Sequence, residues 1–288
     1  MSKSTAIVFI LFGAFFMSFN GVLIKLIEGA NGFQILFYRS ITLSLTVILV
    51  SCVKRKISII KFLSHFDRWD FAIGACLGIA FTTYVFSIMH TSVAATLFIL
   101  ATSPLIASFL SWFFMGEKPS LECSLATFFA LLGVFLMIHE GLKLDRTLGN
   151  ILALIAACSF ASMLFLTRLS TKKDVLNGTF VGGVLSGAFG VFMCIIFDSG
   201  FQVSFVDLTL ILIMGAFAIG IGITLVSWGA PFIPASEVSV IVLLESLLGP
   251  IWVWIFLNQP MSSYEIFGGF LILLSVGGLS YFGSINKQ

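Results

Sequence analysis

The sequence predicts an all-α integral membrane protein of about ten transmembrane helices, built as two inverted five-helix repeats. Three observations predict it. Of the 288 residues, 59% are hydrophobic and only 10% are charged, whereas soluble domains carry about 25% charged residues. The mean hydropathy is +1.14, so lipid must be the solvent for most of the surface. The apolar residues also form runs long enough to cross a bilayer, and the two halves share a pattern.

Polar breaks between the apolar runs define the expected spans. Each run is continuously apolar, as in a membrane helix, and lacks the alternation of a membrane strand. The expected helices are Thr5–Ile27, Gly32–Val53, Trp69–His90, Ser92–Met115, Leu121–His139, Leu148–Leu169, Leu176–Phe197, Asp207–Ala230, Ala235–Leu257 and Tyr264–Gly283. The first run exceeds the h-region of a signal peptide, so we expect it to be retained.

The positions of Lys and Arg predict the orientation, because the cytoplasmic ends of spans carry an excess of both. With the N-terminus inside, 11 of the 15 basic residues fall at cytoplasmic ends. The other four are Lys25, Arg39, Lys143 and Arg146. We therefore expect both termini in the cytoplasm, in a multi-pass protein of the inner (cytoplasmic) membrane.

A repeat with an offset of about 142 residues relates the two halves. The matching positions are Gly78 with Gly220, Thr82 with Thr224, Ser103-Pro104 with Glu245-Ser246, and residues 116–120 with residues 258–262. Because five spans is an odd number, the two units enter the membrane in opposite orientations, as in many secondary transporters. We expect one repeat at residues 1–146 and the second at residues 147–288.

Several of the expected spans contain short motifs. They are Gly13-Ala14 through Asn20 and Lys25, Phe37-Tyr38-Arg39, Ala94 through Pro104, Met115-Gly116-Glu117-Lys118-Pro119, and Ala235 through Glu245. Together, over nearly the whole chain, they resemble the EamA type of the drug/metabolite transporter superfamily. Two positions depart from that pattern. The usual Glu-Pro is Glu245-Ser246 here, and the second acidic motif is Leu257-Asn258-Gln259, which has no acid.

The resemblance implies a ten-helix fold with a central cavity lined by both halves. It also implies transport of small metabolites, amino acids or amphipathic cations, often outward. We therefore interpret the chain as a secondary transporter that moves a small metabolite, amino acid, amine or amphipathic compound by alternating access, with efflux preferred. Proton-coupled or exchange-driven uptake is the alternative within this class.

Two other functional classes lack their signatures. A membrane-embedded enzyme needs several polar groups at membrane depth, and only Glu245 is clearly deep. A channel needs a ring of like residues or a filter sequence. The sequence has no Walker A motif, and its five cysteines form no CxxC pair. We expect no enzymatic activity, no cofactor and no metal.

The expected partners are a small-molecule substrate, the lipid bilayer and, in the coupled alternatives, protons. The net charge of +2 gives no basis for nucleic-acid binding. The protein is expected to be a monomer or a weak homodimer.

Glu245 is the first candidate for substrate binding or coupling, because it lies in the middle of the ninth span. A carboxylate at that depth costs about 2.5–3.5 kcal/mol on insertion, and such residues face the bundle interior or a water cavity. It could bind a substrate ammonium or exchange a proton; alternatively it is a packing residue. Arg39 and Lys25 could meet a substrate carboxylate or could snorkel to headgroups.

The other candidates interrupt apolar runs with polar or bent segments. Pro104 should bend the fourth span, and with Thr102 and Ser103 it should form a polar patch that faces the Glu245 region. Asn20, Tyr84 and Trp228 are candidate groups of the cavity lining. For each of these residues, packing is the alternative role.

Overall fold

The computed structural model describes residues 2–64, 66–116, 121–143, 146–170, 175–232 and 235–285, and those residues contain helices and no strands. The predicted all-α class is therefore confirmed for the described part of the chain. Residues 117–120 of the predicted repeat motif, including Glu117, lie outside it.

The helices follow the predicted apolar runs closely. In the first half they are α1 Lys3–Ser18, α2 Asn20–Leu26, α3 Gly32–Arg55, α4 Ile59–Leu63, α5 Arg68–His90, α6 Val93–Leu100, α7 Ser103–Met115 and α8 Leu121–Lys143. In the second half they are α9 Thr147–Leu169, α10 Leu176–Ile196, α11 Phe205–Ile213, the π-helix η1 Met214–Ile221, α12 Gly222–Gly229, the short η2 Ala230–Phe232, α13 Ala235–Leu257 and α14 Ser263–Ile285.

Within the described residues, seven helical segments are long and apolar enough to cross a membrane. They are α1 with α2, α3, α5, α6 with α7, α9, α10, and Phe205–Phe232. The apolar parts of α8, α13 and α14 are shorter, at Ser124–Leu136, Ile241–Leu257 and Ser263–Gly278. The chain is thus a multi-pass membrane protein, and the other three predicted spans stay predictions.

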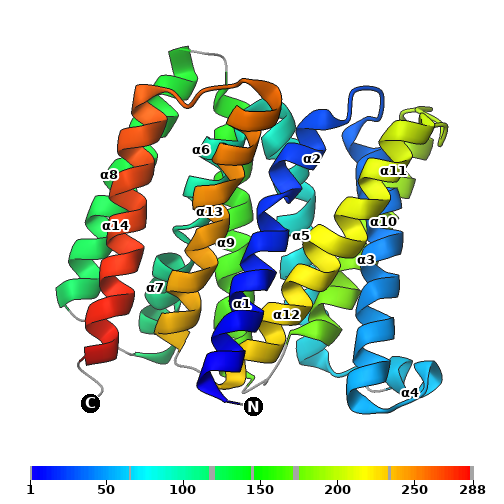
Figure 1. Ribbon diagram of the computed structural model, residues 1–288, viewed down its shortest axis with the longest axis horizontal. Coiled ribbons are helices and arrows are strands. Elements are labelled where there is room, and N and C mark those ends of the chain that lie inside the picture. Colours follow the sequence, from blue (N-terminus) through cyan, green and yellow to red (C-terminus); the bar gives the residue numbers. More distant parts are fainter. Residues whose placement is uncertain are drawn as a thin grey trace.

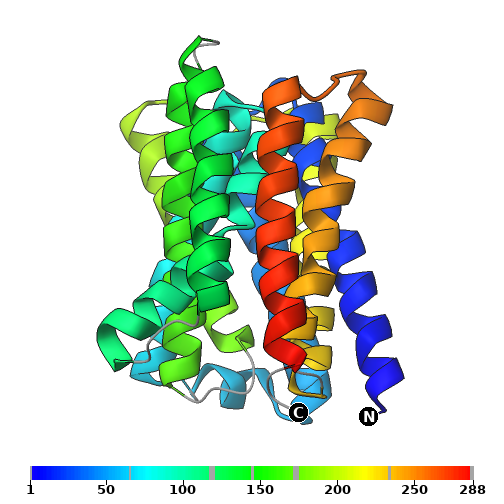
Figure 2. The same cartoon turned by 90° about the vertical axis from the view of Figure 1, so that its left-hand side faces the viewer.

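The helices run roughly alongside one another as a bundle (Figure 1). α1 begins and α14 ends at one end of the bundle, which also carries α4; we call it the proximal end. The connection between α13 and α14 lies at the opposite, distal end, and Figure 2 shows the same arrangement from the side.

Two spans are broken near their middles. α6 ends at Leu100 and α7 begins at Ser103, where the sequence predicts a bend at Pro104. Proline has no N–H, so it leaves the carbonyl of Leu100 without its helical donor. The Ser103 hydroxyl donates to that carbonyl, and the Thr102 hydroxyl donates to the carbonyl of Ile99. The first span is also interrupted, at Phe19 between α1 and α2, where no proline is present.

A third irregularity is the π-helix η1, which packs against α3. Gly215 allows the contact, since a Cβ there would lie 2.3 Å from the carbonyl oxygen of Arg39. Isolated π segments inside helices often occur at functional sites. The contact fixes the stretch of α3 that carries Arg39.

Candidate functional site

Three buried polar residues, drawn from both halves of the chain, converge on a fourth, Tyr84 of α5. Asn20, Arg39 and Glu245 all lie within electrostatic range of its phenol. Asn20 starts α2, Arg39 lies in the distal third of α3, and Glu245 is at the middle of α13. Arg39 is 0% exposed and Glu245 is 8% exposed. We call these four residues the central polar cluster.

Within the described part of the chain, several polar atoms of the cluster have no hydrogen-bond partner. They are Oδ1 of Asn20, Nε and Nη1 of Arg39, and the hydroxyl of Tyr84. Buried polar groups are nearly always paired, and leaving one unpaired costs about 1–3 kcal/mol. Unpaired donors and acceptors from three helices therefore make these residues candidates for contact with a polar ligand or water.

Arg39 is held in place by α5 without being neutralised. Its Nη2 donates to the carbonyl of Phe81 at 3.3 Å, and its guanidinium carbon lies 5.5 Å from the centroid of the Phe81 ring. Its complete burial excludes the snorkelling role considered from the sequence. These contacts orient the cation and leave its remaining donors free for a ligand oxyanion.

Glu245 is the acidic member of the cluster. Among the described residues, no hydrogen bond or ion pair reaches its carboxylate. A buried carboxylate that lacks a partner is costly and is typical of sites that bind a cation or exchange a proton. The cluster thus contains an acid, a base and two neutral hydrogen-bonding groups.

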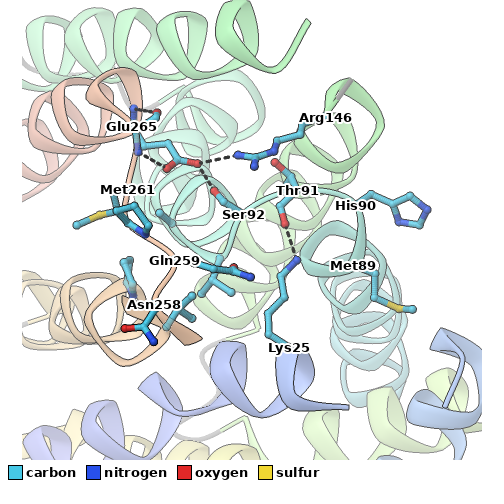
Figure 3. A pocket seen from close by; sticks show the side chains of 16 residues that line it. Lys25, Met89, His90, Thr91, Ser92, Arg146, Asn258, Gln259, Met261 and Glu265 are labelled. Carbon is cyan, nitrogen blue, oxygen red and sulfur yellow. Dashed lines mark hydrogen bonds and ion pairs between the residues drawn. The ribbon is translucent and has the colours of Figure 1, made fainter. Parts of the chain in front are cut away.

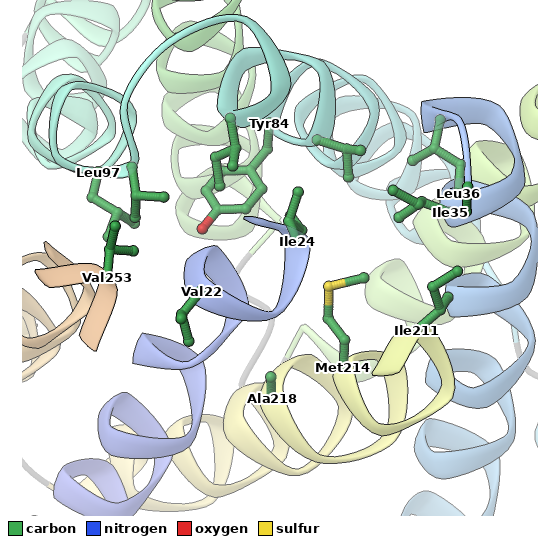
Figure 4. Packing of buried hydrophobic residues seen from close by; sticks show 14 of the residues in the cluster. Val22, Ile24, Ile35, Leu36, Tyr84, Leu97, Ile211, Met214, Ala218 and Val253 are labelled. Carbon is green, nitrogen blue, oxygen red and sulfur yellow. The ribbon is translucent and has the colours of Figure 1, made fainter. Parts of the chain in front are cut away.

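Apolar side chains surround the phenol. Figure 4 shows Tyr84 reaching from α5 into the region bounded by Val22 of α2, Leu97 of α6 and Val253 of α13. Met214 of η1 belongs to the same hydrophobic cluster. This lining excludes bulk water and strengthens electrostatic interactions inside it.

The remaining predicted residues do not join the cluster. The hydroxyls of Thr102 and Ser103 already donate to backbone carbonyls at the break before Pro104. Among the described residues, no hydrogen bond joins either of them to Glu245. Their observed contacts therefore belong to the bend, the packing role weighed against ligand binding.

Trp228 lies apart, at the proximal end of α12. The Lys54 ammonium is 5.3 Å from the centroid of its ring, and the ring of Phe9 meets it edge to face at 6.1 Å. Its Nε1 is buried without a partner. Trp228 is therefore a separate candidate near the proximal end.

A pocket of about 630 Å³ opens at the distal end (Figure 3). Its charged lining residues are Lys25 of α2, Arg146 before α9 and Glu265 of α14. Of the candidates weighed from the sequence, Lys25 lines it, whereas Glu245, Arg39, Asn20, Tyr84, Thr102, Ser103, Pro104 and Trp228 do not. The sequence did contain a signal for this pocket, because Lys25 and Arg146 are two of only four basic residues at the predicted outer ends of spans.

A close contact between α6 and α13 lies between Glu245 and the pocket-lining residues along α13. Gly249 of α13 packs against Leu97 of α6 so tightly that a Cβ would lie 2.2 Å from a Leu97 methyl carbon. Along α13 this contact lies between Glu245 and the pocket-lining residues Pro250 and Val253. Val253 borders both the pocket and the apolar lining around Tyr84, so the two sites are neighbours along α13.

The bundle of apolar helices with buried, unpaired polar groups defines a multi-pass membrane protein with a polar interior site. Comparison identifies its family. The pattern of the EamA-like transporter family matches residues 4–139 and again residues 147–281, so the chain belongs to that family. The chain is a membrane transporter, within the drug/metabolite transporter superfamily.

Two individual proteins are similar to the chain. An "Uncharacterized transporter" of Archaeoglobus fulgidus is 26% identical over 226 residues, which are 76% of this chain and 72% of that protein. A protein of known crystal structure superposes with a TM-score of 0.67 at 16% identity, over 96% of this chain and 98% of that one. The second likeness concerns the fold alone.

Proposed function

We propose that the chain is a secondary transporter that moves a small metabolite outward across the cytoplasmic membrane by alternating access. In this proposal α8, α13 and α14 complete ten spans, with both termini in the cytoplasm. Residues 1–146 and 147–288 form two inverted repeats, and the substrate binds between them. The single observation that carries the proposal is the central polar cluster itself, in which unpaired polar atoms of Asn20, Arg39 and Tyr84 from the first half lie near Glu245 from the second.

The pattern of helix packing supports the inverted repeat. α5 packs on α9, and its counterparts in the other half, η1 and α12, pack on α1. Likewise α6 and α7 pack on α9, while α13 packs on α1 and α2. In addition, α3 packs on its own counterpart, α10, and α8 packs on its own counterpart, α14. Exchanging each span with the one five places later therefore preserves the main contacts, as a pseudo-twofold axis requires.

Each member of the cluster has a role in the proposal. Glu245 binds a substrate ammonium or carries a proton, and Arg39 binds a substrate oxyanion. Asn20 and Tyr84 supply neutral hydrogen bonds. The break at Thr102, Ser103 and Pro104 allows α6 to move relative to α13. This movement would loosen the contact between Leu97 and Gly249. Trp228 lines the proximal route.

The test is flux in liposomes that contain the purified full-length protein. A panel of metabolites and dyes is offered with and without a pH gradient. A carrier gives saturable flux and counterflow, in which an excess of unlabelled substrate on one side drives accumulation of labelled substrate there. Flux that does not saturate and shows no counterflow would identify a channel and reject the proposal.

Proton-coupled uptake is the second candidate, and the unpaired carboxylate of Glu245 favours it over uncoupled transport. Vesicles of known orientation decide between the two directions. In efflux by proton exchange, substrate leaves as protons enter. In proton-coupled uptake, substrate and protons enter together. Substrate movement with the protons would replace the efflux proposal.

A further inference from the structure

The charges that line the distal pocket do not balance among the described residues. Lys25 and Arg146 are cationic, and Glu265 is the acid that lines the pocket with them. The two cations lie close enough to repel each other. A pair of like charges held at one pocket wall is unfavourable until an anion enters between them.

Lys25 is positioned by the backbone and not by an acid. Its ammonium donates to the carbonyl of Thr91 at 2.9 Å. Thr91 is in turn fixed through its hydroxyl, which donates to Oδ1 of Asn150 at 2.8 Å. An ammonium has three donors, and no acid pairs with this one among the described residues. Lys25 is therefore oriented toward the pocket with its charge uncompensated.

Glu265 cannot neutralise both cations, because it carries a single negative charge, and neutral donors orient its carboxylate. The Ser92 hydroxyl donates to Oε1, and the backbone N–H of Ser262 donates to Oε2 at 2.9 Å. Its contact with Arg146 is long, with 3.8 Å between Oε1 and Nη1. Figure 3 shows Glu265 and Lys25 on different sides of the Thr91–Ser92 turn. Arg146 therefore keeps guanidinium donors for a second oxyanion.

We propose that the distal pocket binds the carboxylate of a small, water-soluble organic anion between Lys25 and Arg146. The site is distinct from the central polar cluster, because none of the four cluster residues lines the pocket. Its volume falls in the range of small-molecule sites. Apolar side chains of Met89, Met261 and Val253 complete the lining and can contact an organic body, which an inorganic anion lacks.

The transport role of this site rests on the proposed function: an anionic substrate would occupy it before or after the central polar cluster. Binding itself does not depend on transport. An equilibrium experiment can therefore show no binding at the pocket although liposomes show flux, or show binding although liposomes show no flux. The two proposals are thus tested separately.

The experiment uses ¹⁹F NMR of 4-fluorobenzoate with the purified full-length protein in phosphatidylcholine nanodiscs. The neutral 4-fluorobenzamide is the matched probe. The proposal predicts that the carboxylate binds and that the amide binds at least about tenfold more weakly, because a charge-assisted hydrogen bond is lost. Equal binding of the two probes would overturn the anion site.

Variants assign the binding to this pocket. Lys25→Met should weaken 4-fluorobenzoate binding about tenfold or more, Lys25→Arg should restore most of it, and Lys61→Met in α4 at the proximal end should leave it unchanged. Helical circular dichroism and size-exclusion profiles verify folding. If Lys25→Met fails to fold, Arg146→Gln carries the same prediction. Binding that is indifferent to both substitutions would overturn the proposal.

A lipid headgroup also presents an oxyanion at this depth, so the nanodisc composition separates the two sources. A soluble-ligand pocket predicts little change when half of the lipid is anionic phosphatidylglycerol. Loss of 4-fluorobenzoate binding in those nanodiscs, with binding retained in phosphatidylcholine alone, would reassign the pocket to a lipid headgroup and overturn the proposal.

Discussion

Two arginines on the same helix, α3, have opposite surroundings. Arg55 donates from Nη1 to Oδ1 of Asn177 at 2.9 Å, and Asn177 donates to Oδ2 of Asp70 at 3.3 Å. This proximal network connects α3, α5 and α10. Arg39, about four and a half turns away, has no acidic partner among the described residues, and its Nε and Nη1 lack partners.

The difference separates a structural site from a binding site. A paired network is satisfied as it stands, so its removal should destabilise the fold. A buried, unpaired group raises the energy of the empty protein, so its removal should spare the fold and impair only ligand binding. The predictions below test whether the central polar cluster and the proximal network divide in this way.

Glu245→Gln should have the largest effect and reduce transport to background, because the amide can neither bind a proton nor offer a negative charge. Thermal stability in detergent should not fall, since a neutral amide is easier to bury than an unpaired carboxylate. Asp70→Asn in the proximal network is the matched control and should retain transport. Normal flux with an unchanged pH dependence in Glu245→Gln would remove this residue from the mechanism.

Arg39→Met and Arg55→Met should separate function from stability. Arg39→Met should weaken substrate affinity about 10- to 100-fold, as expected for a lost charge-assisted hydrogen bond, without lowering the melting temperature. Arg55→Met should lower stability by about 1–3 kcal/mol, because it leaves Asn177 without its donor. Flux against substrate concentration and thermal unfolding measure the two effects. The same phenotype in both variants would abolish the distinction.

Tyr84→Phe should have an intermediate effect. It deletes a hydroxyl that makes no hydrogen bond of ordinary geometry among the described residues, so stability should stay the same or rise slightly. A net hydrogen bond of about 0.5–1.5 kcal/mol to the substrate predicts a loss of affinity of about 2- to 12-fold. Tyr38→Phe is the control, because the Tyr38 hydroxyl donates to the carbonyl of Phe201 at 2.6 Å. Unchanged affinity in Tyr84→Phe would place the substrate elsewhere.

Ser103→Ala should have the smallest effect on transport. It removes the donor to the Leu100 carbonyl that Pro104 leaves unpaired, and intramembrane hydrogen bonds are worth about 0.6 kcal/mol on average. A drop of that order in unfolding free energy is expected, with substrate affinity retained. A large loss of affinity at full stability would instead show that the Ser103 hydroxyl contacts substrate.

The fold could be predicted from the sequence because run length and polar breaks determine helix boundaries in a lipid environment. The expected Ala235–Leu257 is α13 itself, and Leu176–Phe197 differs from α10 by one residue. Pro104 likewise predicted the break between α6 and α7. Pro250 gave no such break, since α13 continues through it. The π segment Met214–Ile221 has no sequence signal, because its geometry depends on packing against α3.

The candidate site could be predicted only in part, since sequence places a residue along a helix but not toward a neighbour. Asn20, Arg39, Tyr84 and Glu245 were each chosen as polar interruptions, and the structure brings them together. Trp228 was chosen on the same grounds, yet it lies near the proximal end. Of the distal pocket only Lys25 was named, because Glu265 and Arg146 stand at the starts of separate helices, α14 and α9, which meet only in three dimensions.

The most direct measurement of alternating access is the accessibility of a cysteine placed at Asn20. Asn20→Cys is introduced into protein lacking the five native cysteines and is exposed to a membrane-impermeant maleimide in vesicles of each orientation. The account predicts labelling from both sides, with the balance shifted by a pH gradient or by transported substrate. Labelling from one side alone under every condition, or from neither, would contradict it.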